Sequence, residues 1–165
     1  MSEPRVILIT GASRGIGRAL AVAAAKAGHS VVINYRASAD QAETLADELR
    51  RGSGRAIALQ ADVRVAKDVD RLIGATIAHF GRLDCVVNNA GIGETIAIDA
   101  LDEAVFSQTL HANLTSAFLV SQAAWPHMTG HGGRLVFLSS GAARTGGRLS
   151  AAYACLLYTS PSPRD

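Results

Sequence analysis

Three glycines, Gly11, Gly15 and Gly17, lie close together in the segment Thr10–Gly17, which reads Thr-Gly-Ala-Ser-Arg-Gly-Ile-Gly and follows an apolar run. Gly11 can take a positive φ and turn the chain, and the later glycines let backbone approach a ligand. A helix that begins here directs unpaired N–H groups and the positive end of its dipole at an anion. The segment therefore predicts a pyrophosphate site. Its spacing differs from G-x-G-x-x-G and from a P-loop, so a tight strand-to-helix corner is the alternative.

The elements that position this segment follow from hydrophobic patterning. Short apolar runs alternate with longer helical stretches, and runs such as Val31-Val32-Ile33 are typical of strands buried on both faces of a parallel sheet. Gly28, Gly52 and Gly81 follow three helical stretches, where a left-handed residue ends a helix. The pattern predicts an α/β fold, a doubly wound parallel sheet that is Rossmann-like. The expected strands are 5–10, 30–35, 55–60, 83–88 and 134–139, and the expected helices are 15–27, 39–51, 66–80 and a pair from 101 to about 128.

Further motifs follow the glycine segment in a fixed order. Asn88-Asn89-Ala90-Gly91 ends the fourth expected strand, and Asn113 lies in the long helical region. Ser140 follows the fifth strand, and Tyr153 comes thirteen residues later. With Thr10–Gly17, these residues resemble the short-chain dehydrogenase/reductase family over residues 5 to 154. Within that family the chain looks like the 3-oxoacyl-thioester reductases and, equally, the sugar or polyol dehydrogenases.

The resemblance implies a nicotinamide cofactor across the carboxyl ends of the strands and hydride transfer between it and a carbonyl or alcohol substrate. It makes Tyr153 the general acid in reduction, and Ser140 a hydrogen-bond donor to the same oxygen. Asn113 would hold a water in a proton relay. The competing explanations are that Asn113 caps or kinks a helix, and that Ser139 and Ser140 are turn hydroxyls. Ser140 is preferred to Ser139 on spacing alone.

The resemblance also implies where the cofactor lies. Asn88 and Gly91 would form the floor under the adenosine and ribose. Asp62, after the third strand, matches the family's adenine contact, and a helix N-cap is its alternative. We expect no metal ligands. The predicted cofactor-binding residues are Gly11, Ser13, Arg14, Gly15, Ile16, Gly17, Tyr35, Arg36, Asp62, Val63, Asn88, Ala90 and Gly91.

The end of the second strand bears on which nicotinamide cofactor binds. An acidic residue there would accept bonds from the ribose hydroxyls and repel a 2′-phosphate. The chain has Tyr35 and Arg36 instead, with Arg14 in the glycine segment. Two guanidinium groups attract a phosphate and suit bidentate contact with it. This predicts NADP(H) rather than NAD(H), and the alternative is that both arginines are solvated surface charges.

The chain departs from the family near its last residues. Four residues after Tyr153, where the family has a lysine that lowers the tyrosine pKa and binds the nicotinamide ribose, stands Leu157. Residues 155–165 resemble the translation of a transposase-type sequencing-library adapter. We therefore expect an incomplete domain over 1–154, a non-native tail over 155–165, and a missing C-terminal part. Such a chain would expose apolar faces, be poorly soluble and be at best weakly active.

Composition excludes several other classes of protein. The 165 residues carry a net charge of +2 and 48% hydrophobic residues, which fits one globular domain with scattered charges and no nucleic-acid partner. No apolar stretch approaches the roughly 18 residues of a membrane span, and no signal peptide is visible. We expect a cytoplasmic protein without disulfides, whose parent is a homo-oligomer, a dimer or a tetramer. The alternatives are a non-catalytic dinucleotide-binding or sensor protein and, more remotely, a metal site at His127 and His131.

Overall fold

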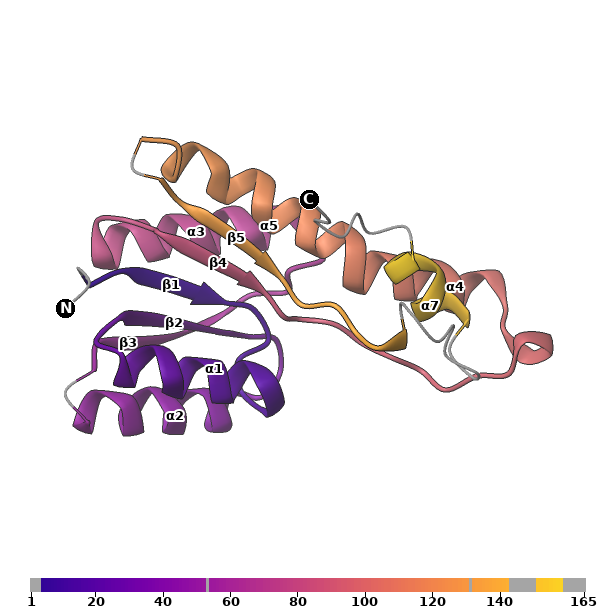
Figure 1. The fold of residues 1–165 in the computed structure, drawn as a ribbon, viewed down its shortest axis with the longest axis horizontal. Helices are drawn as coiled ribbons and strands as arrows, with labels where there is room; N and C mark the ends of the chain where they lie inside the picture. Colours follow the sequence, from indigo (N-terminus) through magenta and orange to yellow (C-terminus); the bar gives the residue numbers. More distant parts are fainter. Residues whose placement is uncertain (1–3, 53, 131, 143–150, 159–165) are drawn as a thin grey trace.

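A computed structural model describes residues 4–52, 54–130, 132–142 and 151–158 (Figure 1). The strands are β1 (Val6–Ile9), β2 (Ser30–Tyr35), β3 (Ala56–Gln60), β4 (Cys85–Asn88) and β5 (Arg134–Phe137). The α-helices are α1 (Gly15–Lys26), α2 (Ala39–Arg51), α3 (Ala66–Phe80), α4 (Glu103–Leu110), α5 (Ser116–Ala124) and α7 (Ala151–Tyr158). The remaining turns are 3-10 at Ile98–Ala100 and Trp125–His127, and π-helical at His111–Thr115.

All strand pairs in the sheet are parallel, and the strand order is β3-β2-β1-β4-β5. Leu8 of β1 pairs with Val32 on one side and Val86 on the other. The strand order reverses between β1 and β4, so the carboxyl ends of these two strands flank a switch point where ligands bind in open α/β sheets. The predicted doubly wound α/β fold is confirmed.

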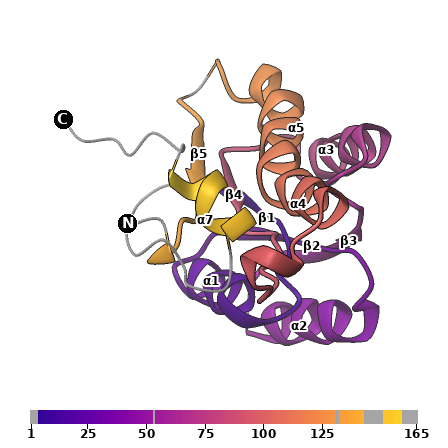
Figure 2. The ribbon, with the colours of Figure 1, turned by 90° about the vertical axis from the view of Figure 1, so that its right-hand side faces the viewer.

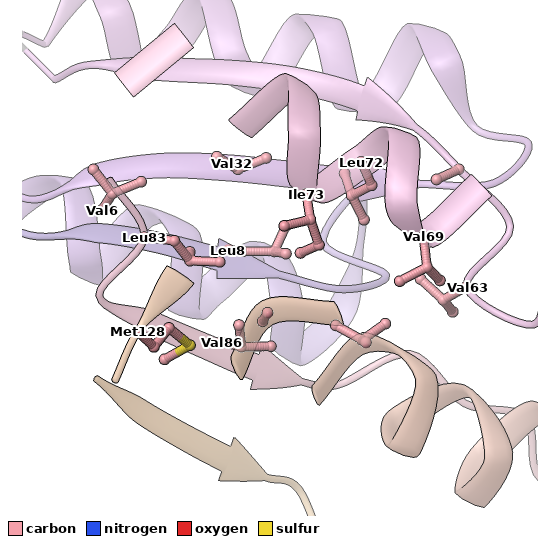
Figure 3. Packing of buried hydrophobic residues seen from close by; sticks show 13 residues of the cluster. Val6, Leu8, Val32, Val63, Val69, Leu72, Ile73, Leu83, Val86 and Met128 are labelled. Atoms are coloured by element: carbon pink, nitrogen blue, oxygen red, sulfur yellow. The ribbon is translucent and has the colours of Figure 1, made fainter. Parts of the chain in front are cut away.

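The helices cover both faces of the sheet, because every central strand is apolar on both sides. Helices α1 and α2 lie on one face, and α3 and α5 lie on the other (Figure 1). On the second face, Leu8 and Val86 of the sheet pack with Leu72 and Ile73 of α3 and with Met128 (Figure 3). One hydrophobic core on each face thus holds the helices to the sheet that carries the site.

The helix ends follow the predicted glycines in two of three cases. Gly28 and Gly81 have φ of 86° and 76° and end α1 and α3 in the left-handed region. Gly52 has φ of −81°, so the prediction of a left-handed residue there is wrong. The Gly54 N–H donates to the Leu49 carbonyl.

Apolar side chains remain exposed on β5 and α5, as expected from the sequence. Val136 and Phe137 are 41% and 58% exposed, and Phe118 and Trp125 are also more than half exposed. Helix α7 packs against α4 (Figure 2). The predicted domain boundary at Ala154 lies inside α7. No helix in the described ranges has the length and apolar character needed to cross a bilayer.

Candidate functional site

The glycine segment lies at the carboxyl end of β1 and lines a cavity of about 390 Å³. We call it the adenosine-side cavity, after the part of the cofactor that the sequence predicts there. Gly11 turns the chain with φ of 62°, as predicted. Arg14 is the N-cap of α1, makes no side-chain capping bond, and is followed by no acidic residue in the first turn. The first-turn N–H groups of α1 therefore have neither a capping side-chain oxygen from Arg14 nor a carboxylate within the turn, which fits a bound pyrophosphate.

Gly17 acts beneath the turn and does not line the cavity. A Cβ placed on Gly17 would lie 2.5 Å from Nδ2 of Asn89 and 2.8 Å from the Gly11 carbonyl oxygen. Gly15 differs, because a Cβ there would meet nothing within 4 Å and its φ is 57°. Gly17 is thus required for the close packing of α1 under the turn, and Gly15 for its backbone conformation.

The turn is held to β4 by a polar knot of Thr10 and Asn89. The Thr10 Oγ1 accepts the N–H groups of Asn89 at 3.0 Å and Ala90 at 2.9 Å. In return, Nδ2 of Asn89 donates to the carbonyls of Thr10 at 2.8 Å and Gly11 at 3.2 Å. These bonds continue the connection between β1 and β4 past their last ladder pair, Ile9 and Val87.

Asn34 links the same turn to the other half of the sheet. Its Oδ1 accepts the Gly11 N–H at 3.3 Å, and its Nδ2 lies within donating distance of the carbonyls of Ala61 (3.1 Å) and Leu59 (3.3 Å). The residue is 2% exposed. Sequence reasoning missed this role, although a lone amide inside an apolar strand was a visible signal that a buried polar bond is needed.

Most predicted cofactor-binding residues meet in the adenosine-side cavity. Asn88 and Gly17 do not line it. Asn88 lies instead in a second cavity, where its Oδ1 is buried and without a hydrogen-bond partner among the described residues. The predicted residues that line the adenosine-side cavity are Gly11, Ser13, Arg14, Gly15, Ile16, Tyr35, Arg36, Asp62, Val63, Ala90 and Gly91.

Asp62 lines this cavity and forms an ion pair with Arg64. Its carboxylate accepts Nη2 of Arg64 at 2.6 Å and Nε at 2.9 and 3.2 Å, together with the Arg64 backbone N–H at 3.0 Å. These bonds from Arg64 hold the Asp62 pKa at about 2, below its ordinary 3.8, and the charge of Arg36 acts in the same direction. Asp62 is not a helix N-cap, because Val65 occupies that position of α3.

The second cavity, about 580 Å³, is the catalytic-side cavity and adjoins the first. Both are lined by Ile16 and by the segment 89–92 after β4. Tyr153 and Leu157 reach the catalytic-side cavity from α7, one turn apart, and Asn113 reaches it from the helix opposite. The phenol residue Tyr153 and the amide residues Asn88 and Asn113 therefore line one cavity next to the adenosine-side cavity.

Asn113 occupies the π-helical turn between α4 and α5. Its Oδ1 accepts the Ile92 N–H at 3.0 Å, while Nδ2 donates to the carbonyls of Ile92 at 2.9 Å and Thr109 at 2.8 Å. Gly91 permits this approach, since a Cβ there would collide with the Asn113 Oδ1. The side chain therefore ties the helix to the loop after β4, and its role in holding a water stays a prediction.

The two candidate serines take different positions. Ser139 lines the catalytic-side cavity, and Ser140 lines neither cavity. The Ser140 Oγ lies 3.3 Å from the Ala142 N–H, which is the local turn bond considered from the sequence. Ser140 is therefore not among the residues that line the catalytic-side cavity with Tyr153, and its role stays a prediction.

The profile of the short chain dehydrogenase family matches residues 5–155 of this chain. The chain belongs to the short-chain dehydrogenase family. The match includes the glycine turn, the segment after β4, and Tyr153.

Individual relatives of this short-chain dehydrogenase agree with the family assignment. A hydroxynaphthalene reductase-like protein of Metarhizium guizhouense is 38% identical over 143 residues, covering 87% of this chain and 53% of the relative. An uncharacterized oxidoreductase of Methylorubrum extorquens is 41% identical over 138 residues, covering 84% and 55%. A dehydrogenase/reductase structure from Sinorhizobium meliloti superposes with a TM-score of 0.89 at 30% identity, covering 93% and 61%. The chain spans about half the length of these curated relatives.

The residues that the structure describes offer no support for metal ligation. They contain no group of three or more His, Cys, Asp or Glu side chains placed to hold a metal ion. His131, half of the histidine pair considered from the sequence, lies outside the described residues. The polar groups that line the two cavities include amides, hydroxyls, a phenol, the Asp62 carboxylate and the arginines.

Proposed function

We propose that the whole protein is an NADP(H)-dependent oxidoreductase that interconverts a carbonyl compound and an alcohol. The observation that carries the proposal is the pair of adjoining cavities, one beside an uncapped helix N-terminus and one holding Tyr153. They share one wall, so a ligand with a phosphate end and a reactive end fits across them. When bound, the nicotinamide would donate or accept the hydride. Reductase names among the relatives support the same class.

The protein groups would handle the proton and the substrate oxygen. Tyr153 would donate its phenolic proton to the carbonyl oxygen during reduction. Ser140, or Ser139 from its place in the catalytic-side cavity, would hydrogen-bond the same oxygen as charge develops on it. Asn113 would position the loop after β4 and support a proton relay.

The preference for NADP(H) rests on Arg14 and Arg36. Both line the adenosine-side cavity, both are exposed, and neither forms an ion pair within the described residues. Tyr35 stands where a carboxylate would repel a 2′-phosphate. Guanidinium groups without partners favour the phosphorylated cofactor.

Leu157 leads us to propose that the natural gene departs from this chain after Ala154. A lysine at 157 would sit one turn from Tyr153 in α7, on the wall of the catalytic-side cavity. We infer that residues 155–165 derive from an adapter, that the domain continues in the parent, and that the parent is a cytoplasmic homo-oligomer. Sequencing the source DNA past the Ala154 codon tests this. A lysine codon at 157 is expected, and a genomic Leu157 would favour a non-catalytic dinucleotide-binding protein.

Cofactor titration tests the function directly. A charge-assisted bond to the 2′-phosphate contributes about 1.5–3 kcal/mol, so NADPH is expected to bind at least about tenfold more tightly than NADH. Replacing Arg14 and Arg36 with alanine should remove the difference. In the full-length parent, Tyr153→Phe should lower turnover about 100-fold or more with cofactor affinity unchanged. Equal affinity for the two cofactors, or tighter NADH, would refute the NADP(H) assignment.

A further inference from the structure

The adenosine-side cavity carries a charge arrangement that the proposed function does not explain. Three guanidinium groups line it, those of Arg14, Arg36 and Arg64, against one carboxylate, that of Asp62. Arg64 is bound to Asp62, whereas Arg14 and Arg36 form no ion pair among the described residues. The arginines thus divide into one that is engaged with the carboxylate and two that are not.

The pairing of Arg64 with Asp62 is fixed from several sides. The side chains are 27% and 21% exposed, and both carboxylate oxygens are engaged. The Asp62 N–H donates to Oδ2 of Asp68 at 3.0 Å. The Arg64 carbonyl lies 3.1 Å from Nε2 of His111. The backbone on either side of the pair is therefore anchored, which keeps the Arg64 guanidinium within reach of the Asp62 carboxylate.

Without Arg64, the Asp62 carboxylate would act on the other cavity charges. Arg36 lies near enough for its charge to influence Asp62 already. An unpaired carboxylate in this partly enclosed space would attract the Arg36 guanidinium and repel a dianionic phosphate. Both effects would oppose NADP(H) and leave NAD(H), which lacks the 2′-phosphate, much less affected.

We propose that Arg64 is a positioning residue for cofactor choice: its paired bonds to Asp62 cancel the carboxylate charge and leave Arg14 and Arg36 to the 2′-phosphate. This inference rests on the proposed function, because it presumes a nicotinamide dinucleotide in the adenosine-side cavity. Arg64 acts through Asp62 and needs no contact with the phosphate. That distinction makes it testable, because a second substitution at Asp62 should cancel the first.

The experiment measures the ratio of the NADH and NADPH dissociation constants for wild type and four variants. Arg64→Ala is expected to lower the NADPH preference about fivefold to tenfold, because the Asp62 carboxylate would then act on the 2′-phosphate without a paired cation. Arg64→Ala combined with Asp62→Asn should return the ratio to within about twofold of wild type. Arg64→Lys should retain part of the preference. Arg18→Ala is the matched control, since it removes an arginine from an exposed pair with Glu48, outside the adenosine-side cavity.

Each outcome has one meaning once circular dichroism confirms that a variant is folded. An unchanged ratio in Arg64→Ala overturns the inference. So does a double variant that stays as unselective as Arg64→Ala, because Arg64 would then act directly on the phosphate. Arg18→Ala with the same loss as Arg64→Ala also overturns it, because net charge alone would explain the effect. A folded full-length parent that binds neither nucleotide refutes the proposed function itself, and the inference with it.

Discussion

Replacing Asn34 with aspartate is expected to destabilise the fold and the site together. The substitution preserves size and the Oδ1 that accepts the Gly11 N–H, but it replaces the Nδ2 donor with an oxygen. That oxygen would face the carbonyls of Tyr35, Leu59 and Ala61, which lie 3.1–3.4 Å from Nδ2. A carboxylate at a position only 2% exposed then has no donor on that side.

The expected cost of Asn34→Asp follows from these contacts. The lost donor bonds account for about 1–2 kcal/mol, and leaving a buried charge unpaired brings the total to roughly 3–5 kcal/mol at pH 7. That is a large share of the roughly 5–15 kcal/mol that stabilises a domain. Urea unfolding followed by circular dichroism measures it. Gln60→Glu is the matched control, because its Nε2 donates to the Arg36 carbonyl at an exposed position, and we expect it to change stability by less than about 0.5 kcal/mol.

The pH dependence gives an independent check of the reasoning on Asn34. The new carboxyl, desolvated and opposed by carbonyls, has its folded-state pKa raised above the unfolded value of about 3.9. Its destabilisation is therefore smallest below pH 4 and increases as the pH rises through the folded pKa. A cost below about 1 kcal/mol at pH 7, or a cost that does not change between pH 4 and 7, would refute the assigned hydrogen bonds.

Three other substitutions probe the same edge of the sheet, and a fourth, in α3, is a control. Gly17→Ala should destabilise the fold by about 1–3 kcal/mol and abolish cofactor binding, because the new Cβ would lie 2.8 Å from the Gly11 carbonyl oxygen. The control Gly74→Ala, at an exposed position of α3, should stabilise the fold by about 0.5–1 kcal/mol. Thermal unfolding compares the two variants. Thr10→Val removes the acceptor of two backbone N–H groups and should cost about 1–3 kcal/mol by urea titration, a prediction that a neutral result contradicts. Asp62 has a folded-state pKa lowered from 3.8 to about 2, so its contribution, about 1 kcal/mol after solvent screening, is present above pH 4 and lost as the pH falls toward 2. Asp62→Asn should flatten the acid limb of the stability curve over that range.

The parts of the fold that depend on local pattern were predictable from the sequence. The run Val31-Val32-Ile33 identified a strand buried on both faces, and the glycine spacing located the turn at Gly11. The prediction of a left-handed conformation at Gly52 was wrong, because a glycine after a helix permits that conformation without requiring it. Local signals of this kind determine elements better than they determine individual backbone angles.

The site was less predictable, because its bonds join residues that are distant in sequence. Nothing near Asn34 indicated that it would reach the ends of β1 and β3, and nothing near Asn113 indicated the tether to Ile92. The pairing of Asp62 with Arg64 spans only two residues, yet its meaning depends on the charges that the fold brings around it. Residue types in order identified the family, whereas the use of each side chain required the packed sheet.

The polar knot of Thr10 and Asn89 also has a consequence for the order in which the molecule assembles. The groups that hold the glycine turn are separated from it by 79 residues of chain. The glycine turn is synthesised early, but the Asn89 amide and the Asn89 and Ala90 N–H groups that hold it are synthesised only after three further strands. Closing so long a loop is entropically costly and slow. The phosphate-binding turn is therefore a late product of folding, completed when β4 inserts beside β1, and a nascent chain ending before Asn89 has the glycines without the site.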